Sequence, residues 1–99
     1  MDSTTLRTAR IARLQRAGWS AHELRERERR LEQRDRAIAA GSKDDRVMCA
    51  LECRHFEPAK AGTGRCNNHR AALLGTPWLG RDLAGQLQRC PGFAPLDRP

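Results

Sequence analysis

The sequence predicts a mainly α-helical protein, in which an N-terminal helical hairpin or arm precedes a small, metal-stabilised cysteine module with short helices. Three observations lead to this fold class. Residues 1–41 contain no proline, and their only glycines are at positions 18 and 41. All four cysteines and six of the eight glycines follow residue 46. Only four residues are aromatic, so the second half cannot build a large core, and small domains of this kind usually need a metal or disulfides.

The first predicted helix spans residues 4–17. Thr4 or Thr5 can cap it, no glycine or proline interrupts it, and Gly18 ends it. Its apolar residues do not separate cleanly from its arginines, so the helix needs a packing partner. The arginines recur at every third position and are Arg7, Arg10, Arg13 and Arg16.

The second predicted helix spans residues 21–40. Ser20 and Glu23 match the S-x-x-E capping box at its start, and Gly41 follows its last turn. The apolar positions form a narrow stripe that supports one light contact, for example against the first helix. The stripe repeats every seven residues, at Leu24, Leu31 and Ile38.

The junction between these helices, residues 17–24, is similar to the turn of a helix-turn-helix. That motif needs a second break about one short helix later, whereas residues 25–40 continue without glycine or proline. We therefore predict an αα-hairpin in which Trp19 plugs the turn.

The chain divides into a basic helical part at residues 1–41, a polar linker at 42–46 and a cysteine module at 47–99. Within the module we predict a short strand or turn near residues 47–51, a loop at 58–64 and short helices at 67–74 and 79–88.

The cysteine spacing, C-x3-C-x12-C-x23-C, indicates a metal site. Cys49 and Cys53 form a close pair of the kind that begins a zinc site, and Cys66 and Cys90 supply two more thiols from tight turns. The alternative fourth ligand is His69, because Cys66-x2-His69 is itself a ligand spacing. Four protein ligands leave no open position on the metal, so its role would be structural.

Zinc is the favoured metal, followed by an iron–sulfur cluster and then by free thiols or disulfides. We expect reduced thiols, because the N-terminus has basic residues where a secretion signal would have an apolar stretch. No apolar run is long enough to span a membrane. We also predict no enzymatic activity, because the sequence has neither a glycine-rich phosphate loop nor an H-E-x-x-H motif.

The formal net charge of +7 favours a nucleic acid or another polyanion as partner. Alternatively, the arginines only solvate the helices. Phe56 could stack on a base beside these cations, although a core role for Phe56 and Phe93 is favoured. The predicted phosphate contacts are Arg7, Arg10, Arg13, Arg16, Arg54, Lys60, Arg65 and Arg70.

Three motifs carry a family resemblance: Cys49-x3-Cys-Arg-His-Phe56, Gly62-x-Gly-x-Cys66 and Leu87-Gln-Arg-Cys-Pro-Gly-Phe93. With them, residues 45–95 resemble a cysteine module of small accessory proteins of bacterial plasmids, integrative elements and phages. Related versions often space the first cysteine pair by two residues, whereas here the spacing is three. The resemblance implies a bacterial cytoplasmic setting and DNA transactions of mobile elements.

Taken together, the sequence predicts a non-enzymatic, nucleic-acid-associated accessory or regulatory protein with a zinc-knuckle-like site. One alternative is a protein–protein adaptor or a phage-type inhibitor that docks through helices 4–17 and 21–40. The other is an iron–sulfur protein.

Overall fold

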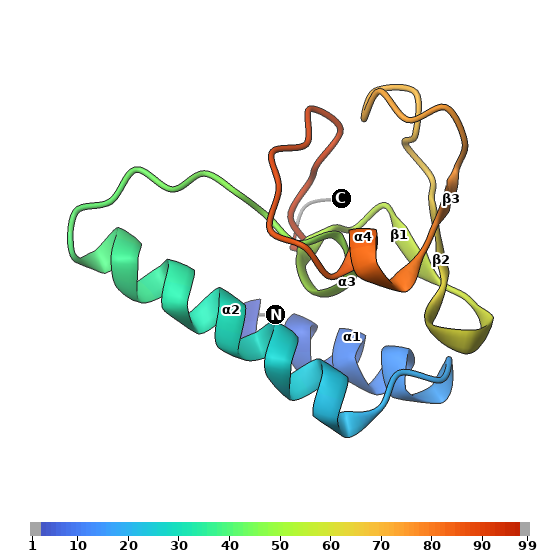
Figure 1. Cartoon of the computed structure of the whole chain (residues 1–99), viewed down its shortest axis with the longest axis horizontal. Helices are drawn as coiled ribbons and strands as arrows, with labels where there is room; N and C mark the ends of the chain where they lie inside the picture. The colour runs from blue at the N-terminus through green and yellow to red at the C-terminus, as the bar shows by residue number, and fades with distance from the viewer. Residues whose placement is uncertain (1–2, 98–99) are drawn as a thin grey trace.

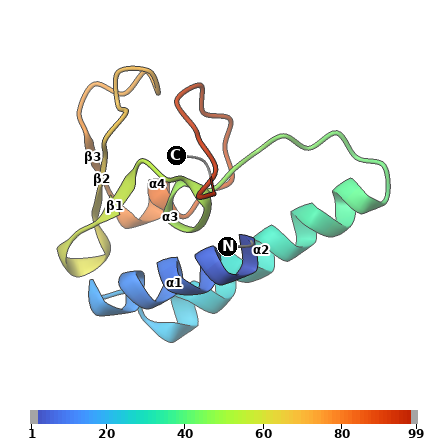
Figure 2. The same ribbon diagram turned by 180° about the vertical axis from the view of Figure 1, so that it is seen from behind.

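The computed structural model describes residues 3–97 and places two long N-terminal helices side by side against a small C-terminal module (Figures 1 and 2). The helices are α1 (Ser3–Arg16), α2 (Ala21–Ala39), α3 (Cys49–Glu52) and α4 (Arg81–Ala84). A 3-10 turn, η1, covers Lys60–Gly62. The strands are β1 (Phe56–Pro58), β2 (Gly64–Cys66) and β3 (Trp78–Leu79).

The helical hairpin is confirmed, and its ends follow the local signals in the sequence. Gly18 turns the chain with a φ of 110°. Ser20 accepts a hydrogen bond from the backbone N–H of Glu23, whose carboxylate accepts from the Ser20 backbone N–H, as a capping box requires. At the other end of α2, Gly41 has a φ of 105° and its N–H donates to the Ile38 carbonyl. The capping box at Ser20 and the left-handed Gly41 therefore mark the two ends of α2.

The hairpin and the cysteine module share one hydrophobic core. Leu14 from α1 and Leu24 and Leu31 from α2 are buried in the same cluster as Met48 and Phe56 from the module. Trp19 is only 3% exposed, as expected for a side chain that plugs the turn. Each fully buried leucine contributes about 2 kcal/mol of transfer free energy. The module is therefore the packing partner that α1 lacks on its own.

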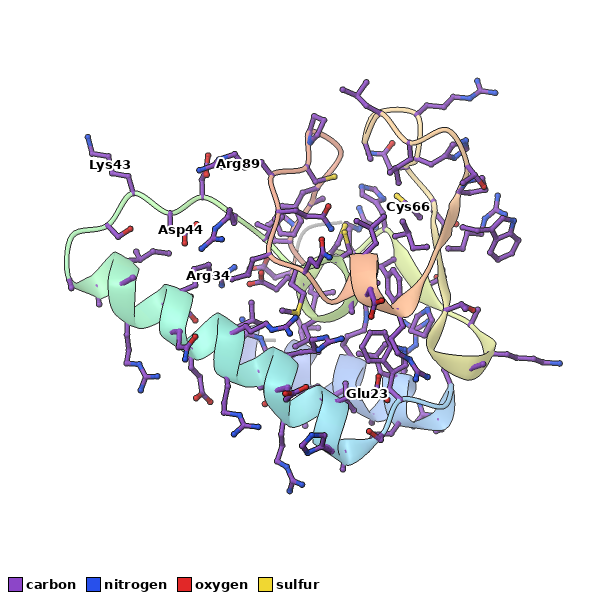
Figure 3. The ribbon with its side chains drawn as sticks, in the orientation of Figure 1. Glu23, Arg34, Lys43, Asp44, Cys66 and Arg89 are labelled. Carbon is purple, nitrogen blue, oxygen red and sulfur yellow. The ribbon has the colours of Figure 1, made fainter. Side chains whose placement is uncertain are left out.

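The α2 stripe is buried for only part of its length. Ile38, its third member, is 43% exposed, because the chain leaves α2 and crosses to the module as an extended linker (Figure 1). An ion pair of 2.6 Å between Arg89 and Asp45 ties this linker to the module; Figure 3 shows Arg89 beside the linker.

A three-stranded antiparallel sheet is the main departure from the predicted, mainly α-helical module. Its order is β1-β2-β3, and Phe56 pairs with Cys66 while Gly64 pairs with Leu79. Gly64 lies under the ring of Phe56, which occupies the space that a Cβ at this position would need. The sheet thus depends on a close approach between Gly64 and Phe56, which lie in different strands, and no local sequence pattern predicts this contact.

Three local predictions for the module were wrong. Residues 67–74 form consecutive turns rather than a helix, and Leu73 adopts a left-handed φ of 61°. Residues 49–52 form α3 where a strand or turn was predicted. The predicted helix at 79–88 is reduced to α4, because Leu79 belongs to β3 and Gly85 ends the helix.

Among residues 3–97, no helix is both long and apolar enough to cross a lipid bilayer.

Candidate metal centre and basic surface

The four cysteines, which are spread over more than forty positions of the sequence, line one small cavity in the module. Its volume is about 40 Å³. In Figure 3, Cys66 projects from β2 toward the middle of the module. The cavity is lined by Cys49, Cys53, Cys66 and Cys90 together with Phe56, Ala72, Leu74, Leu79, Leu83, Gln88, Arg89 and Gly92.

Backbone hydrogen bonds hold the cysteine-bearing segments together. Val47, two residues before Cys49, exchanges hydrogen bonds with Gln88, two residues before Cys90. Cys53 forms an isolated antiparallel bridge with Pro95. The N–H of Cys66 donates to the carbonyl of Pro77, the residue just before β3, over 2.6 Å. Backbone hydrogen bonds of the surrounding fold therefore bring these cysteine-bearing segments together.

Electrostatics in this cavity oppose four free thiolates. Burial, and then the nearby thiols of Cys53, Cys90 and Cys66 in that order, together raise the pKa of the Cys49 thiol to about 12. Burial also raises the pKa of Cys66. Four ionised sulfurs in so apolar a place would be tolerated only with a cation among them, so the site is built either for neutral thiols or for a metal.

Gln88 is the polar neighbour of the thiols. Its side-chain amide Nε2 lies 3.7 Å from Cys49 Sγ and also donates to the Leu83 carbonyl over 2.9 Å. An amide N–H at this distance stabilises negative charge on the sulfur. Gln88 would therefore orient and tune Cys49 as a ligand.

The donor set fits a soft metal, although the side chains are not drawn together around an ion. No group of three or more His, Cys, Asp or Glu side chains in the described part of the chain is arranged to hold a metal as it stands. Binding would require the four thiols to deprotonate and to turn toward the cavity centre. Of the two candidates for the fourth ligand, Cys90 lines the cavity and His69 does not.

Two arginines from the helical hairpin support the ligand loop, the stretch that consists of α3 and its C-cap residue Cys53. Arg10 is 4% exposed and donates to the carbonyls of Ala50 over 3.1 Å and Cys53 over 2.8 Å, with a third contact to the Cys49 carbonyl at 3.4 Å. Its burial lowers its pKa to about 10. Arg10 is therefore not accessible to a phosphate, and we leave it out of the nucleic-acid surface.

Arg34 supports the same loop from α2, as Figure 3 shows. Its guanidinium binds both oxygens of Glu52, over 2.6 and 2.8 Å, and these hydrogen bonds raise its pKa. Glu52 in turn accepts the N–H of Met48 over 3.1 Å. Such a bidentate, partly buried pair fixes the orientation of α3.

The remaining predicted phosphate contacts fall into separate groups. Arg7 pairs with Glu52 over 3.4 Å, and Arg13 pairs with Glu57 over 2.8 Å. Arg16 and Lys60, from opposite halves of the sequence, line one open groove of about 400 Å³ between the end of α1 and the β1–β2 connection. None of the described residues that line this groove is acidic. Arg54, Arg65 and Arg70 are exposed on other parts of the module.

The exposed aromatic residue of the module is Trp78, which sequence reasoning did not single out. Phe56 is 1% exposed and belongs to the core, the role favoured for it, whereas Trp78 is 59% exposed. The guanidinium of Arg65 lies 5.4 Å from the Trp78 ring centre. The available signal was the alternation in β3, where buried Leu79 leaves its neighbour Trp78 on the opposite face.

Comparisons with family models, with curated proteins and with solved structures found no match to this chain.

Proposed function

We propose that this chain is a non-enzymatic accessory protein that associates with nucleic acid and whose C-terminal module is ordered by a metal. The metal site is proposed because four cysteines that are distant in sequence line one apolar cavity. Cys49, Cys53, Cys66 and Cys90 would hold the metal as thiolates. With four protein sulfurs it would have no open position for a substrate, so it would stabilise the fold rather than catalyse a reaction.

The basic groove supports the nucleic-acid part of the proposal. Arg16 and Lys60 come from different halves of the chain, yet face the same groove without an acidic neighbour among the described lining residues. Two cations at one groove on a protein with a net charge of +7 favour a phosphate backbone as ligand. The adaptor alternative has less support, because Leu24 and Leu31 of the hairpin are already buried against the module.

An iron–sulfur cluster is the second candidate, because the four thiols that line the cavity are also the ligands that such a cluster needs. The protein would then be a redox or sensing protein, with the same four thiolates as ligands.

Elemental analysis of anaerobically purified protein, with a visible spectrum of the same sample, decides between these candidates. We expect about one zinc per chain and no colour, since four thiolates complete one tetrahedral zinc site. Iron with sulfide and a brown spectrum would replace the structural role with the iron–sulfur one. A colourless protein without metal would overturn both.

Two matched variants test the ligand set. We expect Cys90→Ser to lower the metal content and His69→Ala to leave it unchanged, because only Cys90 lines the cavity. The opposite result would assign the fourth position to His69.

A further inference from the structure

We propose that the outer face of the three-stranded sheet binds single-stranded nucleic acid, with Trp78 as the surface on which a base stacks. This inference rests on the proposed association with nucleic acid for its electrostatics. It adds the strand state of the ligand and the residue that contacts the base.

The sheet register places the relevant side chains in one row. Glu57 of β1 is directly opposite Arg65 of β2, and Arg65 is directly opposite Trp78 of β3. Directly paired residues project from the same face of a sheet, so these three side chains share the outer face. The opposite face carries Phe56, Cys66 and Leu79, which are buried. The row is thus held in place by the core and the thiol cavity behind it.

Trp78 has the properties of a stacking residue. Trp19, the other tryptophan, is 3% exposed and has the guanidinium groups of Arg27 and Arg81 about 6 Å from its ring centre, whereas Trp78 is 59% exposed. A large aromatic side chain left in water at this level, on a face fixed by strand pairing, is available to a flat apolar ligand. Stacking on an aromatic ring is the sequence-tolerant way in which proteins hold unpaired bases.

Arg65 supplies the neighbouring positive charge in a defined orientation. Its Nε donates to the Asn67 side-chain oxygen over 3.2 Å, and its guanidinium lies 5.4 Å from the Trp78 ring centre. The hydrogen bond with Asn67 uses one of the five N–H donors of the guanidinium, which leaves others for a phosphate. The Arg65 guanidinium therefore lies over one face of the Trp78 ring, and a base would stack on the other face.

The charge around the row favours a polyanion. Glu57, its acidic member, is paired with Arg13 over 2.8 Å. Next to Glu57 in β1 is Pro58, which lines the groove of Arg16 and Lys60. This groove therefore begins at the β1 edge, about 10 Å or two strand spacings from β3. A strand whose base stacks on Trp78 can place phosphates at Arg65 and in the groove, whereas the bases of a duplex are already stacked on each other.

Binding of a fluorescein-labelled oligothymidylate to the full-length, metal-replete protein tests this inference. We expect Trp78→Ala to weaken binding at least fivefold, because one base–aromatic stack contributes about 1–3 kcal/mol. Trp78→Phe should keep most of the affinity. Leu73→Ala is the matched control, since Leu73 is 83% exposed but lies outside the sheet. Binding should also quench tryptophan fluorescence, and Trp78→Ala should remove that quenching because Trp19 is buried.

The outcomes separate this inference from the function on which it rests. If Trp78→Ala binds like the wild type while an Arg16→Ala/Lys60→Ala double variant binds more weakly, the stacking surface is overturned and the association with nucleic acid stands. Equal affinity for oligothymidylate and for a duplex of the same length overturns the preference for single strands. If the wild type binds neither at low salt, both proposals fail. Oligouridylate in the same assay distinguishes an RNA ligand from a DNA ligand.

Discussion

The helical hairpin and the cysteine module reach ordered structures by different means. In the hairpin, a capping box at Ser20 and left-handed glycines at 18 and 41 set the helix ends, and Leu14, Leu24 and Leu31 supply apolar contacts. The module has two- and three-residue strands and four-residue helices, and its segments meet around four thiols. Short elements of this kind are not stable alone. Local signals therefore set the helix ends of the hairpin, whereas long-range bonds and, as we propose, a metal hold the segments of the module together.

Removal of the proposed metal is the most direct test of how the module is stabilised. We expect a strong chelator, or the variant Cys53→Ser, to destabilise the module strongly without unfolding it in every molecule, because loss of a structural metal removes folding free energy directly. Amide hydrogen exchange should then show lost protection over residues 47–95, while part of α2 remains protected. Ala71→Ser, on an exposed turn, is a neutral control. Full protection of the module without metal would contradict its proposed role.

The metal-free protein should also become less stable as the pH rises. The unfolded Cys49 thiol ionises near its ordinary pKa of 9.0, whereas in the folded state burial keeps the proton until about 12. Above pH 9 the unfolded state therefore binds fewer protons than the folded state, and the free energy of unfolding falls with increasing pH. Urea unfolding at several alkaline pH values checks this. The metal-loaded protein should lack this particular decline, since its thiols are already deprotonated.

Arg10 joins the two halves, so its removal tests how strongly they depend on each other. We expect Arg10→Ala to lower the free energy of unfolding by about 3 kcal/mol, because buried carbonyls of the Cys49–Cys53 loop lose their donor. Arg25→Ala, on the exposed surface of α2, should change it by less than about 0.5 kcal/mol. If both variants changed the free energy of unfolding equally, the buried hydrogen bonds of Arg10 would not contribute to stability. A loss of metal content in Arg10→Ala would show that the hairpin positions the ligand loop.

Gly64 tests the packing that joins the sheet to the core. We expect Gly64→Ala to destabilise the protein by about 2 kcal/mol, since the added methyl group would meet the buried Phe56 ring. Gly75→Ala is the matched control, because nothing lies within 4 Å of a Cβ at that position. Thermal unfolding of both variants gives the comparison. An unchanged Gly64→Ala protein would mean that the ring can move aside.

Gly64 also shows why the sequence predicted the hairpin better than the module. The hairpin depends on signals that act within four residues, such as Ser20 with Glu23. The strand β2 is Gly-Arg-Cys, which has little intrinsic strand preference and depends on Phe56 from another strand. Residues 67–74 looked helical, but they form turns, and the side-chain amide of Asn68 donates to the Gly92 carbonyl over 3.0 Å. Long-range bonds of this kind are not visible in a local pattern.

The candidate site was also predicted only in part, since the thiols were found from local sequence features and the burial of the basic and aromatic side chains was not. The close Cys49–Cys53 pair and the tight turns around Cys66 and Cys90 predicted the four thiols that line the cavity. The arginines were predicted as one group from charge alone, and charge does not indicate burial. Arg10 proved to be a buried support for the ligand loop, whereas Arg16 and Lys60 share a groove. Trp78 was missed because its exposure depends on the strand pairing of β3.

The smallest expected effect belongs to the hairpin, where local signals act. We expect Ser20→Ala to lower the free energy of unfolding by about 1 kcal/mol, because the N–H of Glu23 loses the hydroxyl that caps it over 3.1 Å. Ser20→Asp should retain most of the stability, since a carboxylate accepts the same bond and favours the helix N-terminus. Urea unfolding measures both variants. Metal content should stay at the wild-type level in each, because the cap lies outside the cavity lining. If Ser20→Ala also lost metal, α2 would depend on its cap for docking Arg34 onto the ligand loop, and the two halves would be coupled more tightly than their contacts indicate.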